Sequence, residues 1–132
     1  MKNIYNQVYS HDTEVDLTHK INTSELNNWI THLQYTKKEL NHLVAISNGI
    51  LEGKFVDSFE EKHNENYDFL NLLTSYKNSR DSITECEDTE CDMAFISDHE
   101  NFRQGYTYYL ENYRKIKDSF FEELRAAITS KK

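Results

Sequence analysis

Proline is absent from this 132-residue sequence, and glycine occurs only three times. Both residues break helices, so their scarcity removes the main obstacles to long helices. No apolar run approaches the roughly 20 residues of a membrane-spanning helix, and the first residues lack the apolar stretch of a signal peptide. The composition therefore predicts a helical protein of the cytoplasm that does not bind membranes.

Cysteine is also scarce, since only Cys86 and Cys91 are present and two cysteines cannot form a disulfide framework. In a reducing cytosol both are expected to remain thiols. Structural zinc sites usually take two cysteine pairs, whereas this chain has one pair with His99 as a distant third ligand. The cysteines therefore do not indicate a zinc site.

An excess of positive charge is missing, because the formal net charge is −8. Proteins that bind nucleic acid use clustered lysines and arginines against the phosphates, so a nucleic-acid partner is excluded. Many of the acids lie between residues 81 and 100, and several bases follow toward the carboxyl end of the chain. This order complements a helix dipole, which favours a solvated helix end over a cation site.

Apolar residues recur at steps of three and four in three segments. The first predicted helix begins at a cap formed by Asn22 and Glu25 and ends near Gly53, a natural left-handed stop. The second runs from about Asp57 to Arg80. The third contains the most regular stripe, which is Phe95, His99, Phe102, Tyr106, Tyr109, Tyr113, Ile116 and Phe120.

These stripes predict an all-α fold, an antiparallel bundle of three long helices within residues 23–132. Residues 1–22 are polar and aperiodic, so they are expected to form an amino-terminal arm or tail. The segment 82–96 contains a further cap pattern, and it is either a loop, the start of the third helix or a fourth short helix.

Two Glu-x-x-His pairs, Glu39 with His42 and Glu60 with His63, have the ligand spacing of di-iron carboxylate bundles. Residues three apart share a helix face, so each pair can reach one ion. However, the heptad phase of the first helix turns His42 outward. A divalent metal bound by these four residues is therefore the alternative prediction, and no other cofactor is expected.

A polar set on the inward stripes consists of His63, His99, Tyr106, Tyr109 and Tyr113. With a turn near residue 86, His63 would lie level with Tyr106 to Tyr109. A histidine and a tyrosine meeting inside the bundle would form either a ligand or proton-transfer pocket, or a hydrogen bond that fixes helix register. The second interpretation is favoured, because polar groups in helical seams serve this purpose.

The sequence contains no P-loop, nucleophile elbow or dinucleotide-binding glycine pattern. We therefore expect a structural or protein-protein interaction module without catalytic activity, whose partner is another protein or a second copy of the chain. Two pairs, Trp29 with Ile30 and Phe120 with Phe121, widen their stripes and are predicted to form an apolar edge for that partner.

Overall fold

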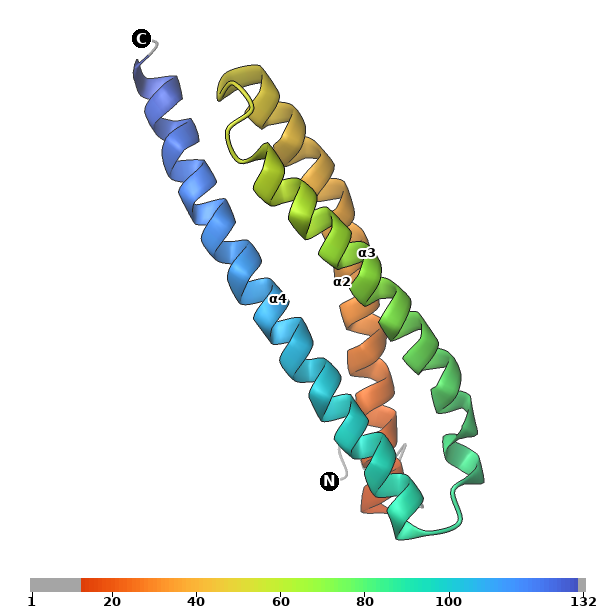
Figure 1. Cartoon of the computed structure of the whole chain (residues 1–132). Coiled ribbons are helices and arrows are strands. Elements are labelled where there is room, and N and C mark those ends of the chain that lie inside the picture. Colours follow the sequence, from red (N-terminus) through yellow and green to blue (C-terminus); the bar gives the residue numbers. More distant parts are fainter. Residues whose placement is uncertain (1–12, 131–132) are drawn as a thin grey trace, which may run out of the picture.

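The computed structural model describes residues 13–130 and shows three long helices packed side by side (Figure 1). Helix α2 spans Glu14–Ile50, α3 spans Val56–Ser79 and α4 spans Thr89–Ser130, and a short 3-10 helix, η1, spans Arg80–Glu85. α2 and α3 form an antiparallel hairpin, and α4 runs back along it. No strand occurs between residues 13 and 130, and the predicted all-α bundle of three helices is confirmed.

Helix α2 begins earlier than the predicted cap at Asn22. Thr13 is the N-cap residue, and its hydroxyl accepts a hydrogen bond from the backbone N–H of Asp16 while the Asp16 carboxylate accepts from that of Thr13. Asn22 is buried inside the helix. Residues 14–22 therefore belong to the bundle rather than to a polar arm, and the rest of that arm, residues 1–12, lies outside the described residues.

The turn between α2 and α3 depends on left-handed backbone. Gly53 has φ of 82°, as predicted for a helix stop, and Phe55 has φ of 75°. The carbonyl of Ser47 accepts the N–H groups of both Leu51 and Gly53, and the Ser47 hydroxyl donates to the carbonyl of Lys54. These bonds close a short connection, which makes the two helices antiparallel neighbours.

The segment between α3 and α4 corrects the prediction of a possible short helix at residues 82–96. Residues 80–85 continue α3 as the 3-10 helix η1, and the later part of the segment belongs to α4. The carboxylate of Asp88 accepts the backbone N–H of Cys91 at 2.8 Å. Asp88 therefore caps the amino end of α4. This helix thus begins separately from η1.

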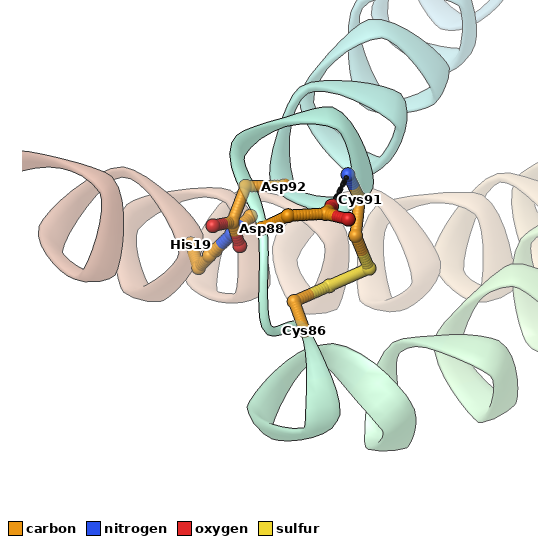
Figure 2. Close-up of a disulfide and its surroundings, with 5 residues drawn as sticks. All are labelled: His19, Cys86, Asp88, Cys91 and Asp92. Atoms are coloured by element: carbon orange, nitrogen blue, oxygen red, sulfur yellow. Dashed lines mark hydrogen bonds and ion pairs between the residues drawn. A yellow bond between two sulfur atoms is a disulfide. The ribbon is translucent and has the colours of Figure 1, made fainter.

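Cys86 and Cys91 form a disulfide rather than the two thiols that the sequence predicted (Figure 2). Cys86 follows η1 directly, and Cys91 lies in the first turn of α4. Because the connection turns back sharply, the two Cα atoms lie 5.5 Å apart, within the usual range for a disulfide. The bond ties the end of η1 to the beginning of α4.

The core consists of two clusters along the bundle. Their buried members are Leu26, Trp29, Leu33, Leu73, Tyr76 and Tyr109 in one cluster, and Leu40, Leu43, Phe59, Tyr113 and Phe120 in the other. Trp29 and Phe120 were expected at an apolar edge, but both lie in the core. Of the predicted edge, Phe121 is the large side chain that stays exposed.

None of the helices between residues 13 and 130 is both long and apolar enough to cross a membrane.

Candidate functional site

His99 lies at the centre of a polar network that joins all three helices. Its side chain is 0 % exposed. Its Nδ1 atom lies 2.8 Å from the Tyr76 hydroxyl of α3, and its Nε2 atom lies 2.8 Å from Glu25 Oε1 of α2. The ring stacks on Trp29 with 4.8 Å between centroids. Both imidazole nitrogens are thus hydrogen-bonded, and Trp29 covers one face of the ring.

The direction of these hydrogen bonds follows from their ends. Arg80 can only donate, so its Nη1 group donates to the Tyr76 oxygen at 2.9 Å. An ionised Glu25 can only accept, so His99 donates to it through Nε2–H. Burial lowers the pKa of His99 below its usual value, which keeps the ring neutral, and Nδ1 must therefore accept from the Tyr76 hydroxyl. The chain runs from Arg80 through Tyr76 and His99 to Glu25.

Arg103 of α4 binds Glu25, the last residue of this chain of hydrogen bonds. Its Nη2 group donates to Glu25 Oε1 at 2.7 Å, and its Nε group donates to Oε2 at 3.2 Å, so the guanidinium grips the carboxylate with two bonds. Burial alone would raise the pKa of Glu25, but the bonds from Arg103 and His99 lower it below its usual value. The neutral pair Tyr76–His99 therefore lies next to a Glu25 carboxylate held in its charged form.

His19 of α2 is held at the same end of the bundle by both sides of the disulfide-closed connection. From η1, Arg80 Nη2 donates to the backbone carbonyl of His19 at 2.6 Å. From α4, the Asp92 carboxylate lies 2.9 Å from His19 Nε2, next to Cys91 (Figure 2). Arg80 before the disulfide and Asp92 after it therefore both bind His19 of α2.

The network can set helix register, because each of its bonds joins two different elements or two turns of one helix. Buried polar groups that are fully bonded specify a single arrangement, since any slip would leave them without partners. Both ring nitrogens of the buried His99 are bonded to protein side chains, which favours the register interpretation over a ligand pocket.

We expect the free energy of unfolding to fall as the pH drops below about 6.5, the ordinary pKa of histidine. Because the pKa of His99 is lowered in the folded protein, the unfolded chain takes up a proton first, which favours unfolding. Glu25, whose folded pKa is also lowered, adds to this loss below about 4.5. Urea titrations at pH 8 and pH 5.5 measure the effect, and an equal pH dependence in His99→Leu would contradict the role of His99.

The other predicted polar residues do not gather at this site, since each bonds to a residue outside the predicted set. Tyr106 bonds to His32 of α2, and Tyr113 donates to Glu39 at 2.5 Å. Burial and the Glu39 carboxylate raise the pKa of Tyr113. His63 is half-buried and lies 2.8 Å from Asn41. The set is therefore distributed along the bundle.

Tyr109 has its own buried contacts. Its hydroxyl donates to the carbonyl of Lys62 at 3.3 Å and accepts from Asn66 Nδ2 at 3.4 Å. Burial raises the pKa of Tyr109 to about 12, so the hydroxyl stays protonated. The bond from Tyr109 to Lys62 places this part of α3 beside Tyr109, and His63 is the next residue after Lys62. The His63 side chain, however, bonds to Asn41 of α2.

The Glu-x-x-His residues are not brought together as a metal site. Glu39 accepts hydrogen bonds from Tyr113 and Lys117, and His42 and Glu60 are exposed. Across residues 13–130, no group of three histidine, cysteine, aspartate or glutamate side chains is placed to hold a metal ion. The metal-binding alternative is therefore not favoured.

A second feature is an open groove of about 310 Å³ between α3 and α4. Phe69 lies in it against Gly105, where a Cβ atom would come within 3.1 Å of the Phe69 ring. Leu72 and Tyr108 line it with exposed fractions of 57 % and 70 %. Gly105 thus allows the Phe69 ring to lie directly against α4. The other lining residues are Lys62, Glu65, Asp68 and Tyr109.

Sequence reasoning found His99 but missed its partners Glu25, Tyr76, Arg80 and Arg103. A usable signal was present, because Tyr76 and Arg80 are four residues apart on one helix face, as are His99 and Arg103. This spacing places each arginine one helical turn from the tyrosine or histidine that belongs to the network.

No known protein family matches the chain, and neither a curated protein nor a solved structure matches it.

Proposed function

We propose that this protein is a helical docking module that binds a basic amphipathic helix of another protein in the groove between α3 and α4. The observation that carries the proposal is the exposure of Leu72 and Tyr108 beside Phe69 in one open, largely apolar groove. An apolar groove between two helices suits a helix that inserts side chains spaced three and four residues apart. Large exposed side chains that share a groove are typical of interaction sites.

The charge around the groove selects the kind of partner. The first part of α3 carries exposed or half-exposed acids, which are Asp57, Glu60, Glu61, Glu65 and Asp68. The one lysine in that stretch, Lys62, is buried and bonds to Glu65 at 2.7 Å. Two of these acids, Glu65 and Asp68, line the groove itself, so lysines and arginines flanking an apolar stripe would complement it.

We expect a synthetic amphipathic helix of leucine and lysine to bind the protein, and Leu72→Lys to weaken this binding by on the order of tenfold. Fluorescence anisotropy of the labelled peptide measures the dissociation constant. Tyr67→Lys is the matched control, because Tyr67 is exposed on the same helix but does not line the groove. It adds the same charge and should leave the affinity nearly unchanged.

A second peptide with glutamate in place of lysine should fail to bind, because its charges repel the acids of α3. Raising the salt concentration should weaken the lysine peptide, since the charges at the groove are exposed to solvent. Equal affinity for Leu72→Lys and Tyr67→Lys would show that the peptide binds elsewhere by charge alone. Absence of binding to the unmodified protein at about 1 mM, the weak limit of specific recognition, would also reject the proposal.

The cytoplasmic location is a prediction from the sequence alone. The Cys86–Cys91 disulfide argues against the free thiols that were expected with it. Disulfides persist in oxidising compartments, whereas reducing cytosol converts most of them to thiols. The disulfide therefore supports an oxidising compartment. The docking proposal does not depend on the compartment, because the groove residues lie on α3 and the middle of α4.

A further inference from the structure

The last turns of α4 present an apolar stripe that lies outside the core. Phe121 and Ile128 are each 50 % exposed, and Leu124 between them is half-buried. An open hollow of about 620 Å³ lies along this stripe, and every residue that lines it belongs to α4. In the described chain, therefore, no second element forms a wall of this hollow.

The exposure of the stripe follows from the divergence of α4 from the hairpin toward its carboxyl end (Figure 1). Lys54, in the turn between α2 and α3, bonds to Glu123 of α4 at 3.0 Å, which places the hairpin turn level with that residue. α4 continues to Ser130, and its carboxyl end stands apart from the hairpin tip (Figure 1). The final turns of α4 thus diverge from the helices that cover the rest of it (Figure 1).

Charged residues of both signs flank the stripe on one side. Asp118 and Glu122 are one turn apart, and Arg125 follows three residues after Glu122. All three line the same hollow as Phe121 and Ile128. The acids come first and the base follows, so the order of charge reverses when the helix direction is reversed.

We propose that this surface pairs with the same surface of a second copy, with the two α4 helices antiparallel about a two-fold axis. A two-fold contact uses one patch twice, so the patch must complement itself. In an antiparallel pair the same side of each helix meets, which brings Glu122 of one copy level with Arg125 of the other. Phe121 then lies level with the gap between Leu124 and Ile128 of the second copy.

The charge pattern selects a second copy over the basic helix that fits the groove between α3 and α4. Arg125 flanks the apolar stripe beside Glu122, so a strongly basic partner would place a like charge against it. The reversed copy instead offers an acid to each Arg125 and a base to each Glu122. The proposal is independent of the docking groove, which lies on another face formed by different residues.

Charge reversal tests this pairing, with the assembly state measured by light scattering and analytical ultracentrifugation. We expect the unmodified protein to dimerise, and Glu122→Arg and Arg125→Glu each to weaken the dimer by on the order of tenfold or more, because each places like charges together twice. A mixture of the two single variants should form a heterodimer with both pairs complementary. The double variant carrying both reversals should recover the dimer.

The control is Glu111→Arg, a charge reversal at an exposed position of α4 that does not line the hollow, and it should leave the dimer intact. Helix content measured by circular dichroism verifies that all variants are folded, and the exposure of these positions makes this the expected result. An unmodified protein that is monomeric at about 1 mM would overturn the proposal. Single variants that dimerise as well as the unmodified protein, or a mixture that forms no heterodimer, would overturn it too.

Failure of this proposal can be distinguished from failure of the docking function. Leu72→Lys should dimerise normally while losing the lysine peptide, because Leu72 lies on α3 outside the stripe. Glu122→Arg should bind the peptide normally while losing the dimer. A variant that affects both measurements equally would contradict the separation of the two surfaces.

Discussion

We expect His99→Leu to lower the free energy of unfolding by about 3 kcal/mol, because it removes one member of a buried polar chain and leaves the others in place. The Tyr76 hydroxyl would lose its acceptor, and Glu25 would lose the donor 2.8 Å from its Oε1 atom. Leucine retains apolar contact with Trp29, so the loss of hydrogen bonds dominates. Urea titration followed by helix circular dichroism measures this change.

The matched control is His63→Leu, at a half-buried position on α3. His63 bonds to Asn41 at 2.8 Å, and both groups can bond to water instead when the partner is lost. We expect this change to cost less than about 0.5 kcal/mol, as for most substitutions near the surface. Equal losses for the two histidines would show that the His99 network contributes no more than an exposed hydrogen bond.

A double-mutant cycle separates the hydrogen bond from other effects of the His99 change. Tyr76→Phe removes the hydroxyl that bonds to both His99 and Arg80. If the Tyr76–His99 bond matters, the double variant should cost less than the sum of the two single variants, with a coupling of about 1 to 2 kcal/mol. Strictly additive losses would contradict a bond between these side chains.

The third helix was predictable because its stripe is aromatic and nearly unbroken. Phe102, Tyr109 and Phe120 all pack in the observed clusters, as the steps of three and four required. By contrast, the first helix was predicted to begin too late, because His19 and Asn22 occupy two of its inward positions. Polar residues at stripe positions conceal a helix from any analysis that counts only apolar side chains.

The partners within the polar network could not be predicted, because they depend on register between helices. Tyr76 and His99 meet only when the connection of η1 and the loop after it has the observed length. A shift of one residue would rotate the Tyr76 side chain by about 100°, since a helix has 3.6 residues per turn. The sequence does not reveal how long η1 and the following loop are, because a 3-10 helix and a loop have similar composition.

The disulfide could not be predicted for the same reason, because it too depends on the geometry of the connection between α3 and α4. Cys86 and Cys91 are close because η1 ends at Glu85 and α4 begins at Thr89, and neither boundary was predicted. A count of two and an expected reducing cytosol favoured free thiols, and neither feature reports the distance between the cysteines. The folded geometry therefore determines whether the two cysteines are bonded, and composition alone does not reveal it.

We expect Phe120→Ala to lower the free energy of unfolding by about 4 kcal/mol, whereas Phe121→Ala should change it by less than about 0.5 kcal/mol. Phe120 is 0 % exposed and packs edge-on against both Phe55 and Phe59, with ring centroids 5.9 and 5.2 Å away. Removing the ring leaves a cavity between the hairpin and α4. Urea titration at low protein concentration, where the chain is monomeric, measures both changes.

The two adjacent phenylalanines should exchange roles when association is measured instead. Phe121→Ala removes the side chain that would insert between Leu124 and Ile128 of a second copy, so it should weaken the dimer by on the order of tenfold while the fold is retained. If both phenylalanines lower stability equally, Phe121 belongs to the core and its exposure has no role in binding. If Phe121→Ala alters neither stability nor association, then the apolar stripe of α4 does not hold a second copy, because the central contact of that pairing would be dispensable.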